Sequence, residues 1–298
     1  MEREYLMSKI AILTDSSADL TPEQASKYGI DVLTFVMTLD GKDYKTNENC
    51  TVEEFYDILR QGKGVPSTAA ITQLQFCEQF CHYVDEGYTD VLYVSICKSG
   101  SSTYNNAVMA QQMLAEERPG NALRVHIVDS HTYSMTFGWY LLEAARKIRN
   151  GAELAPIIAE LEDIYSRCEL VLTAFTLKQM KKSGRISAAA AFAGELLGLR
   201  PIIQLNFGVS KVVAKVRGND AVPAAMIKQV QNRVADVSEM RYQIGYTDCE
   251  ETAQNLAKQC KKAFGHAPEV IFHLGGVVSC NTGPDAIAIA YLNSEHKE

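Results

Sequence analysis

Apolar runs alternate with amphipathic stretches along the first half of the chain. Four runs have the length and composition of buried strands: KIAILTD, DVLTFVMTL, DVLYVSI and RVHIVDS. Helical patterns separate or follow them: TPEQASKYG with Thr21 as N-cap and Gly29 as C-cap, TVEEFYDILRQG with Thr51 as N-cap, and FGWYLLEAARKIRNG. This alternation predicts a mostly parallel sheet whose faces are covered by helices.

Two further helices are predicted in the same half. One is expected from about Thr103 to Glu116. The other is the amphipathic stretch TQLQFCEQFCHYVDEG, whose apolar spacing predicts a buried face made of Leu74, Phe76, Phe80 and Val84. Both would add to the helical layers on the predicted sheet.

The second half has a different pattern. Strands are predicted in LVLTAFT, MRYQIGYTD, EVIFHLG and AIAIAYL, and RPIIQLNFGVSKVVAKVRG reads as a hairpin that turns at Asn206-Phe207-Gly208. Helices are predicted in LKQMKKSG, in the Ala-rich stretch AAAAFAGELLG and between Thr252 and Phe264. The fold class is therefore α/β, with two domains. Residues 1–168 form a larger domain with a mostly parallel sheet flanked by helices, and residues 169–298 form a smaller α+β domain with a partly antiparallel sheet; the boundary lies near Cys168.

Composition and charge narrow the class of protein. The 298 residues are 47% hydrophobic and 22% charged, which is ordinary for a soluble globular chain of two domains. The net charge of −7 argues against nucleic acid as a partner. Up to Leu170 there are 14 Lys and Arg against 25 Asp and Glu, and from Val171 onward 15 against 11. The more basic second part either meets an acidic partner or anionic ligand or reflects ordinary surface variation.

The cysteines and histidines give no sign of a metal site. Eight cysteines are scattered without paired spacing, and Cys77 and Cys81 are separated by one helical turn, not by a C-x-x-C motif. We expect a reduced, cytoplasmic chain with no structural zinc, no other metal and no cofactor. The opening residues do not resemble a secretory signal, and no apolar run reaches the ~18 residues of a membrane helix.

Hydroxyl-rich loops follow three predicted strands of the first half. They carry Asp15-Ser16-Ser17, the run from Ile96 to Thr103, and Asp129-Ser130 with Ser134; the segment Pro66 to Thr72 is a fourth such loop before a helix. The carboxyl ends of parallel strands share one edge of the sheet, where helix N-termini also point. Such a cluster suits a carboxylate or a phosphate. The same residue types are also favoured as helix caps and in turns, so the loops alone leave both interpretations open.

Signatures of catalysis are few. The chain has no G-x-x-x-x-G-K-[ST], no G-x-G-x-x-G and no G-x-S-x-G. Ser16 beside Asp15, with His131 close to another strand end, is a conceivable nucleophile set. On the residues alone, a binding protein is favoured over a catalyst.

Several motifs in order resemble the DegV family. They are ILTDSSADL, a Thr-headed loop before a helix, the loop KSGSSTY, IVDS, LKQMKKSGRIS, KVRG and TGPDA, which together span about Ile10 to Leu292. The resemblance implies a larger α/β domain and a smaller domain with an antiparallel sheet, with a long-chain fatty acid bound between them. It also implies that the chain itself performs no chemistry and presents the acid to a separate fatty-acid kinase subunit.

The resemblance also implies which residues hold the carboxylate. They are Thr68, Ser101 and Asn281, the last standing where the family has a histidine, and we add Ser16 and Thr103 from the hydroxyl-rich loops. The chain departs from the family pattern at several further positions, namely Ala69, Ala70, Ile71, Ser102 and Asp285. These departures leave a carrier of another small anion as an alternative, and a small Ser-dependent hydrolase or phosphatase using Ser16 or Ser101 is the rival from another class.

Two arginines match family positions that form a basic surface. Arg185 in SGRIS and Arg217 in KVRG, together with nearby lysines, are predicted to dock the kinase or to guide the head group of the product. Alternatively, the positive charges of those lysines only stabilise the partial negative charge at a helix C-terminus. A protein that presents a fatty acid to a kinase could also contact a membrane surface transiently, and we include such a contact among the expected interactions. For the acyl chain, the small side chains of ISAAAAFAGELLGL, flanked by Phe192, Leu196 and Leu197, are expected to line a channel or simply to pack tightly.

Asn281 leads to a prediction about pH. An amide can donate an N–H to a carboxylate but carries no charge, whereas histidine titrates near pH ~6.5. We therefore expect that head-group binding shows no histidine-like step between about pH 6 and 7 that originates at this position. Measuring the affinity for a fatty acid across this range tests the expectation, and a sharp step that depends on position 281 would contradict it.

Overall fold

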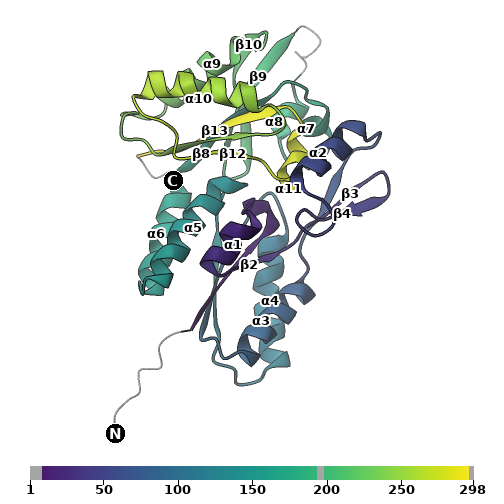
Figure 1. Cartoon of the computed structure of the whole chain (residues 1–298), viewed down its shortest axis with the longest axis vertical. Helices are drawn as coiled ribbons and strands as arrows, with labels where there is room; N and C mark the ends of the chain where they lie inside the picture. Colours follow the sequence, from purple (N-terminus) through teal and green to yellow (C-terminus); the bar gives the residue numbers. More distant parts are fainter. Residues whose placement is uncertain (1–8, 193–197, 295–298) are drawn as a thin grey trace.

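The computed structural model describes residues 9–192 and 198–294, which form two lobes stacked along the long axis (Figure 1). Within these residues, the first lobe contains a parallel four-stranded sheet in the order β2 (Ile30–Leu33), β1 (Ile10–Asp15), β6 (Asp90–Ser95) and β7 (Arg124–Asp129). We call this part the parallel-sheet lobe. The fold is of the α/β class that the strand–helix alternation predicts.

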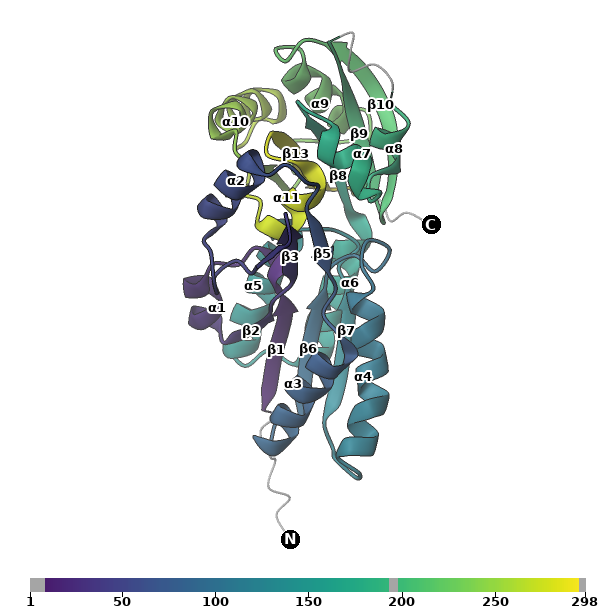
Figure 2. The ribbon, with the colours of Figure 1, turned by 90° about the vertical axis from the view of Figure 1, so that its right-hand side faces the viewer.

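Helices cover both faces of the parallel sheet (Figure 2). On one face lie α3 (Gln73–Asp85) and α4 (Thr103–Glu117), and on the other α1 (Pro22–Tyr28) and α5 (Met135–Arg149), with α6 (Leu154–Arg167) against α5. The short 3-10 helix η1 (Ser16–Ala18) follows β1, and α2 (Val52–Gln61) lies toward the second lobe. Thr21, Thr51 and Thr72 each close a capping box, which explains why these helices begin where they do.

The predicted inner face of α3 is partly wrong. Phe76 and Phe80 are buried and Val84 is half-buried, but Leu74 is 59% exposed. Residues four apart share a helix face, whereas a residue two positions before Phe76 points to nearly the opposite side. Because Phe76 and Phe80 contact the core, Leu74 faces solvent.

The run DVLTFVMTL, predicted as one strand, forms two. The first part is β2, and the second is β3 (Val36–Leu39), which joins β4 (Lys42–Tyr44) and β5 (Ser67–Ala69) in a small antiparallel sheet. Between them, the backbone N–H of Phe35 donates to the hydroxyl of Ser16 and not to a strand partner. An apolar run alone does not reveal this change of partner.

The second lobe contains a mixed sheet, so we call it the mixed-sheet lobe. Its order is β10 (Val209–Arg217), β9 (Leu199–Asn206), β8 (Cys168–Ala174), β13 (Ala286–Leu292), β11 (Tyr242–Tyr246) and β12 (Ile271–His273). Neighbouring strands are antiparallel except β11 and β12. The hairpin predicted around Phe207 and Gly208 is present. The chain passes from α6 to β8 at Cys168, and the division into domains of residues 1–168 and 169–298 stays a prediction.

The two faces of the mixed sheet have different partners. One face packs against α9 (Val222–Gln231) and α10 (Glu250–Phe264), while α7 (Lys178–Ser183) and α8 (Ser187–Ala190) contact the other. The segment α11 (Gly276–Thr282) lies between the lobes (Figure 2). The sequence pattern did not predict α6, α9 or α11. The predicted Ala-rich helix extends over residues 193–197, which lie outside the described residues.

Candidate functional site

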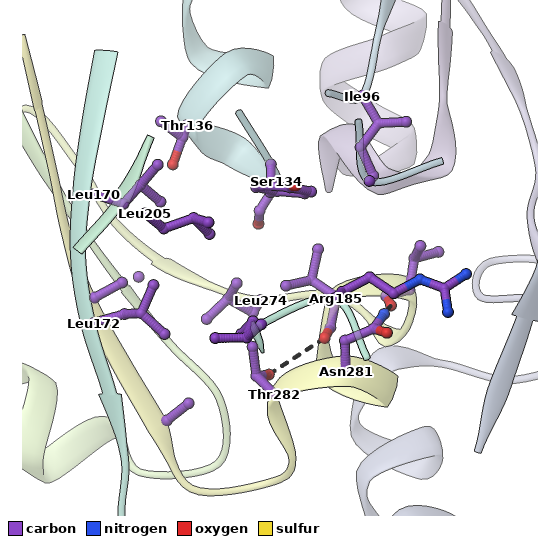
Figure 3. Close-up of a pocket in the computed structure, with 18 of the residues that line it drawn as sticks. Ile96, Ser134, Thr136, Leu170, Leu172, Arg185, Leu205, Leu274, Asn281 and Thr282 are labelled. Carbon is purple, nitrogen blue, oxygen red and sulfur yellow. Dashed lines mark hydrogen bonds between the residues drawn. The ribbon is translucent and has the colours of Figure 1, made fainter. Parts of the chain in front are cut away.

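A cavity of about 230 Å³ lies where the carboxyl edge of the parallel sheet meets α11 and the mixed sheet (Figure 3). A single water molecule needs only about 10–15 Å³ by the same kind of measure, so this space is large enough for a ligand. Its lining comes from loops after β6 and β7, from β5, from α11 and from strands of the mixed sheet. The cavity is therefore built from both lobes.

The loop after β6 is held in place by two carboxylates at neighbouring strand ends. Asp15, at the end of β1, accepts the backbone N–H of Ile96 at 3.2 Å, and Asp129, at the end of β7, accepts that of Lys98 at 3.1 Å. Burial raises the pKa of Asp15, although its hydrogen bonds oppose that shift. These bonds position Ser101 at the cavity.

Three of the predicted head-group residues line the cavity: Thr68, Ser101 and Asn281. Thr68 lies on β5, paired with Met37 of β3. The hydroxyl of Ser101 lies 2.9 Å from that of Thr103. The structure thus brings together side chains that are 213 positions apart at the extremes; their role in binding stays a prediction.

Asn281 is partly committed to its own helix. Its Nδ2 donates to the carbonyl of Val277 at 3.0 Å, which leaves the second N–H and Oδ1 for a ligand. Arg185 also lines the cavity, close to Asn281 in Figure 3. A role of Arg185 in docking the kinase or in guiding the head group of the product stays a prediction.

The other predicted site residues lie elsewhere. Ser16 does not line this cavity, and its hydroxyl accepts the N–H of Phe35 at 3.0 Å. Thr103 is fully buried at the start of α4, where it supports Ser101 and does not line the cavity. Arg217 is exposed at the end of β10.

Two departures from the family pattern have clear positions. Ser102 contributes to the cavity lining. Asp285 does not line the cavity, and its carboxylate accepts the backbone N–H and the hydroxyl of Thr176 at 3.3 and 2.9 Å. Burial raises the pKa of Asp285, and the bonds from Thr176 oppose that shift. The carboxylate is therefore bound by Thr176 and does not face the cavity.

The interior of the cavity is mostly apolar and comes largely from the mixed sheet. Side chains alternate along β8, so Leu170 and Leu172 face the cavity while Val171 packs in the core with α9 and α10. The remaining apolar lining includes Ile186, Leu205, Leu274, Val277, Val278, Ile287 and Ala288.

The expected acyl channel in the Ala-rich segment differs from this arrangement. Phe192 is buried in a cluster with Ala188 and Ala189 and does not line the cavity, and Leu196 and Leu197 lie outside the described residues. Tight packing is the interpretation that fits Phe192. The alternating side chains of β8 could have indicated two different faces of this strand. The pattern does not indicate which of the two faces borders the cavity.

The rival set of catalytic residues is not assembled. His131 lies 3.0 Å from Asp129, and its ring contacts Phe207, while Asp15 accepts hydrogen bonds from Ser17. Within residues 9–192 and 198–294, neither Ser16 nor Ser101 hydrogen-bonds to a histidine. Across the same part of the chain there is no cluster of His, Cys, Asp and Glu fit to hold a metal ion, and no helix long and apolar enough to cross a membrane.

Asp19 fixes the start of α11 and was missed by the sequence analysis. Its carboxylate accepts the backbone N–H of Gly275 at 2.8 Å and the hydroxyl of Ser134. A side chain at position 275 would collide with this carboxylate, so only glycine allows the approach. Burial raises the pKa of Asp19 to about 7. The pair Gly275-Gly276 was the only signal in the sequence.

The described fold and cavity define a class: a two-lobed α/β protein with a ligand-sized pocket between its lobes. The family model described as "Uncharacterised protein, DegV family" matches residues 9–294. A DegV domain-containing protein from Clostridium perfringens is 28% identical over 289 residues, covering 96% of this chain and 98% of that protein. The chain belongs to the DegV family.

Solved structures of relatives share the fold. A fatty acid binding DegV family protein from Streptococcus agalactiae is 27% identical with a TM-score of 0.83, covering 97% of this chain and 100% of that one. A DegV family protein from Thermus thermophilus, described by its fatty acid binding, is 26% identical with a TM-score of 0.82, covering 96% and 99%.

The raised pKa of Asp19 predicts a stability that depends on pH. The folded state binds this proton more tightly than the unfolded chain, whose aspartate titrates near 3.8, so stability should fall as pH rises from about 4 to about 7. We expect Asp19→Asn to reduce this fall by a few kcal/mol at most, because one pKa unit corresponds to about 1.4 kcal/mol. Denaturant unfolding at pH 5 and pH 8 measures it.

Asp40→Asn is the matched control, because Asp40 is exposed and backbone hydrogen bonds lower its pKa. Asp40→Asn should show the same decrease in the free energy of unfolding between pH 5 and pH 8 as the wild type. Asp15 contributes a slope of the same sign, so Asp19→Asn should retain part of it. An unchanged slope in Asp19→Asn would show that Asp19 does not titrate in this range.

Proposed function

We propose that this protein binds a long-chain fatty acid in the cavity and presents its carboxylate to a separate kinase subunit in the cytoplasm. The observation that carries the proposal is one cavity with hydroxyl and amide groups at one end and leucine-rich walls beyond them. The relatives from Streptococcus agalactiae and Thermus thermophilus, both described as fatty acid binding, support it.

The head group is held by short polar side chains. Thr68 and Ser101 donate hydroxyl hydrogens to the carboxylate, and the free N–H of Asn281 adds a third donor. Arg185 adds a positive charge, which stabilises either the carboxylate or a phosphorylated product. The protein performs no chemistry itself, because the kinase supplies the phosphate.

The energies explain why these few contacts matter. Burying a chain of about sixteen carbons removes apolar surface worth about 0.8 kcal/mol for each methylene, or on the order of 12 kcal/mol relative to water. A membrane offers the same gain, so the tail gives little preference for the protein over a bilayer. Hydrogen bonds to the charged head group, worth about 1.5–3 kcal/mol each, and the shape of the cavity therefore decide the partition.

Loss of one head-group hydroxyl should weaken binding. We expect Thr68→Val and Ser101→Ala each to reduce the affinity for a long-chain fatty acid by about 10- to 100-fold, because each removes one hydrogen bond to a carboxylate. Ser67→Ala changes an exposed hydroxyl on the same strand as Thr68 and should bind like the wild type. Solvent extraction and mass spectrometry of the purified protein first show whether a fatty acid co-purifies. Displacement of a fluorescent fatty acid then measures the affinity of each variant.

Absence of any co-purifying fatty acid, combined with no binding of added acid, would refute the proposal. Turnover of ester or phosphate substrates would instead support the hydrolase alternative. Wild-type affinity in both Thr68→Val and Ser101→Ala would place the head group elsewhere.

Docking of the kinase is a separate part of the proposal. Arg217 is exposed at the end of β10 and does not line the cavity, so its charge is available to an acidic partner. We expect Arg217→Glu to reduce phosphorylation of the bound acid by a fatty-acid kinase at least ~10-fold, while fatty-acid binding stays unchanged. Arg118→Glu, on an exposed helix end of the parallel-sheet lobe, is the control. Equal kinase coupling in wild type and Arg217→Glu would count against docking at this position.

A further inference from the structure

The tip of the β9–β10 hairpin, in the mixed-sheet lobe, contacts the loop that carries Ser101. The hydroxyl of Ser99 donates to the backbone carbonyl of Phe207 at 3.0 Å. Ser99 belongs to the loop after β6, and Ser101, two residues further on, lines the cavity. The hairpin tip therefore bonds to the same loop that supplies a predicted head-group hydroxyl, although Phe207 itself does not line the cavity.

Gly208, the second residue of the tip, lies directly against Ser99. A Cβ atom at position 208 would lie 2.9 Å from the Cβ of Ser99 and closer still to its Oγ. Rotating the Ser99 hydroxyl away would break its bond to Phe207, and it would not move the Cβ, which follows the backbone. Only glycine therefore allows the hairpin tip and the loop to approach this closely.

The backbone of Phe207 has a conformation that bulky side chains disfavour. Its φ is 50° and that of Gly208 is 76°, the pattern of a two-residue hairpin turn whose first position usually holds Asn, Asp or Gly. The ring of Phe207 contacts the ring of His131, with 4.5 Å between their centroids, and His131 belongs to the loop after β7. Turn preference does not explain a phenylalanine here, whereas contact with the other lobe does.

Tyr133 restricts the loop at the next residue. A Cβ atom at Gly100 would lie 2.7 Å from the Oη of Tyr133 and 2.8 Å from a carbon of its ring. Gly100 stands between Ser99 and Ser101, so the loop is closely packed at both residues that precede the head-group hydroxyl. A shift of Ser99 would have little room to be absorbed at Gly100 and would reach Ser101.

We propose that the hairpin tip positions the head-group loop, so that Phe207 and Gly208 determine how well the protein recognises a carboxylate without touching it. The inference rests on the proposed function and adds positioning residues to it. A hydrogen bond weakens steeply as its angle departs from linearity, whereas burial of an acyl chain is not directional. A small displacement of Ser101 would therefore weaken binding of the head group and leave binding of the tail nearly unchanged.

Two ligands of equal chain length separate these effects. Palmitic acid and hexadecanol each displace a fluorescent fatty acid from the purified full-length protein, and the ratio of their affinities measures recognition of the carboxylate. We expect Gly208→Ala to reduce this ratio ~10-fold or more, the effect of losing one hydrogen bond to a charged group. Ser99→Ala, which changes an exposed side chain and removes the bond to Phe207, should also reduce the ratio.

Gly218→Ala is the matched control. Gly218 has the same φ of 76° as Gly208, but a Cβ there would have no described atom within 4 Å. The control therefore introduces the same backbone strain without a collision, and its ratio should stay at the wild-type value. Thermal unfolding of each variant confirms that it folds, and if Gly208→Ala does not fold, the ratio in Ser99→Ala decides.

The Ser101→Ala background shows whether the effect passes through Ser101. Adding Gly208→Ala to Ser101→Ala should not lower the ratio further, because the group that the tip positions is already absent. A wild-type ratio in Gly208→Ala and Ser99→Ala, or an equal further loss in the Ser101→Ala background, would overturn the inference while fatty-acid binding stands. Failure of palmitic acid to bind the wild type would overturn the proposed function, and this inference with it.

Discussion

The buried carboxylate of Asp19 joins three segments that are distant in the sequence. It receives the hydroxyl of Ser134 at the start of α5 and the N–H of Gly275 at the start of α11. The position of α11 depends on this contact, and α11 carries Asn281 as well as two apolar side chains of the cavity wall. Burial of the carboxylate is unfavourable when it is ionised, as its raised pKa shows. Burial of the ionised carboxylate therefore reduces stability near neutral pH, whereas its hydrogen bonds with Ser134 and Gly275 oppose that effect.

The energy of binding divides between the two ends of the cavity in different ways. In the proposed complex, the leucines of the mixed sheet would provide most of the affinity relative to water, but they would not distinguish the protein from a lipid bilayer. In the proposed complex, Thr68, Ser101 and Asn281 would contribute less energy than the tail but most of the discrimination between a protein-bound and a membrane-bound acid.

Much of the fold and part of the site could be predicted from the sequence. Period-two apolar runs and threonine caps identified most strands and several helices, because these signals are local. The family motifs identified Thr68, Ser101 and Asn281, which the structure brings to one cavity. Contacts between distant segments had no local signal. The split of DVLTFVMTL, the exposure of Leu74, the approach of Asp19 to Gly275 and the cavity face of β8 all depend on which element lies opposite, and one sequence does not state that.

Strand β8 has one side in a packed core and the other facing the cavity. In the proposed complex, the acyl chain would lie against this face of the sheet, beside the cluster that α7 and α8 form with it. Leu170, Leu172 and Leu205 also pack in a cluster with Met180 and Ile186, so an empty cavity would deprive them of part of their contacts, and voids are disfavoured in protein interiors. In the proposed function, one lipid would then leave as another enters, and the rate of this exchange, more than the affinity, would set how fast the protein can deliver fatty acids.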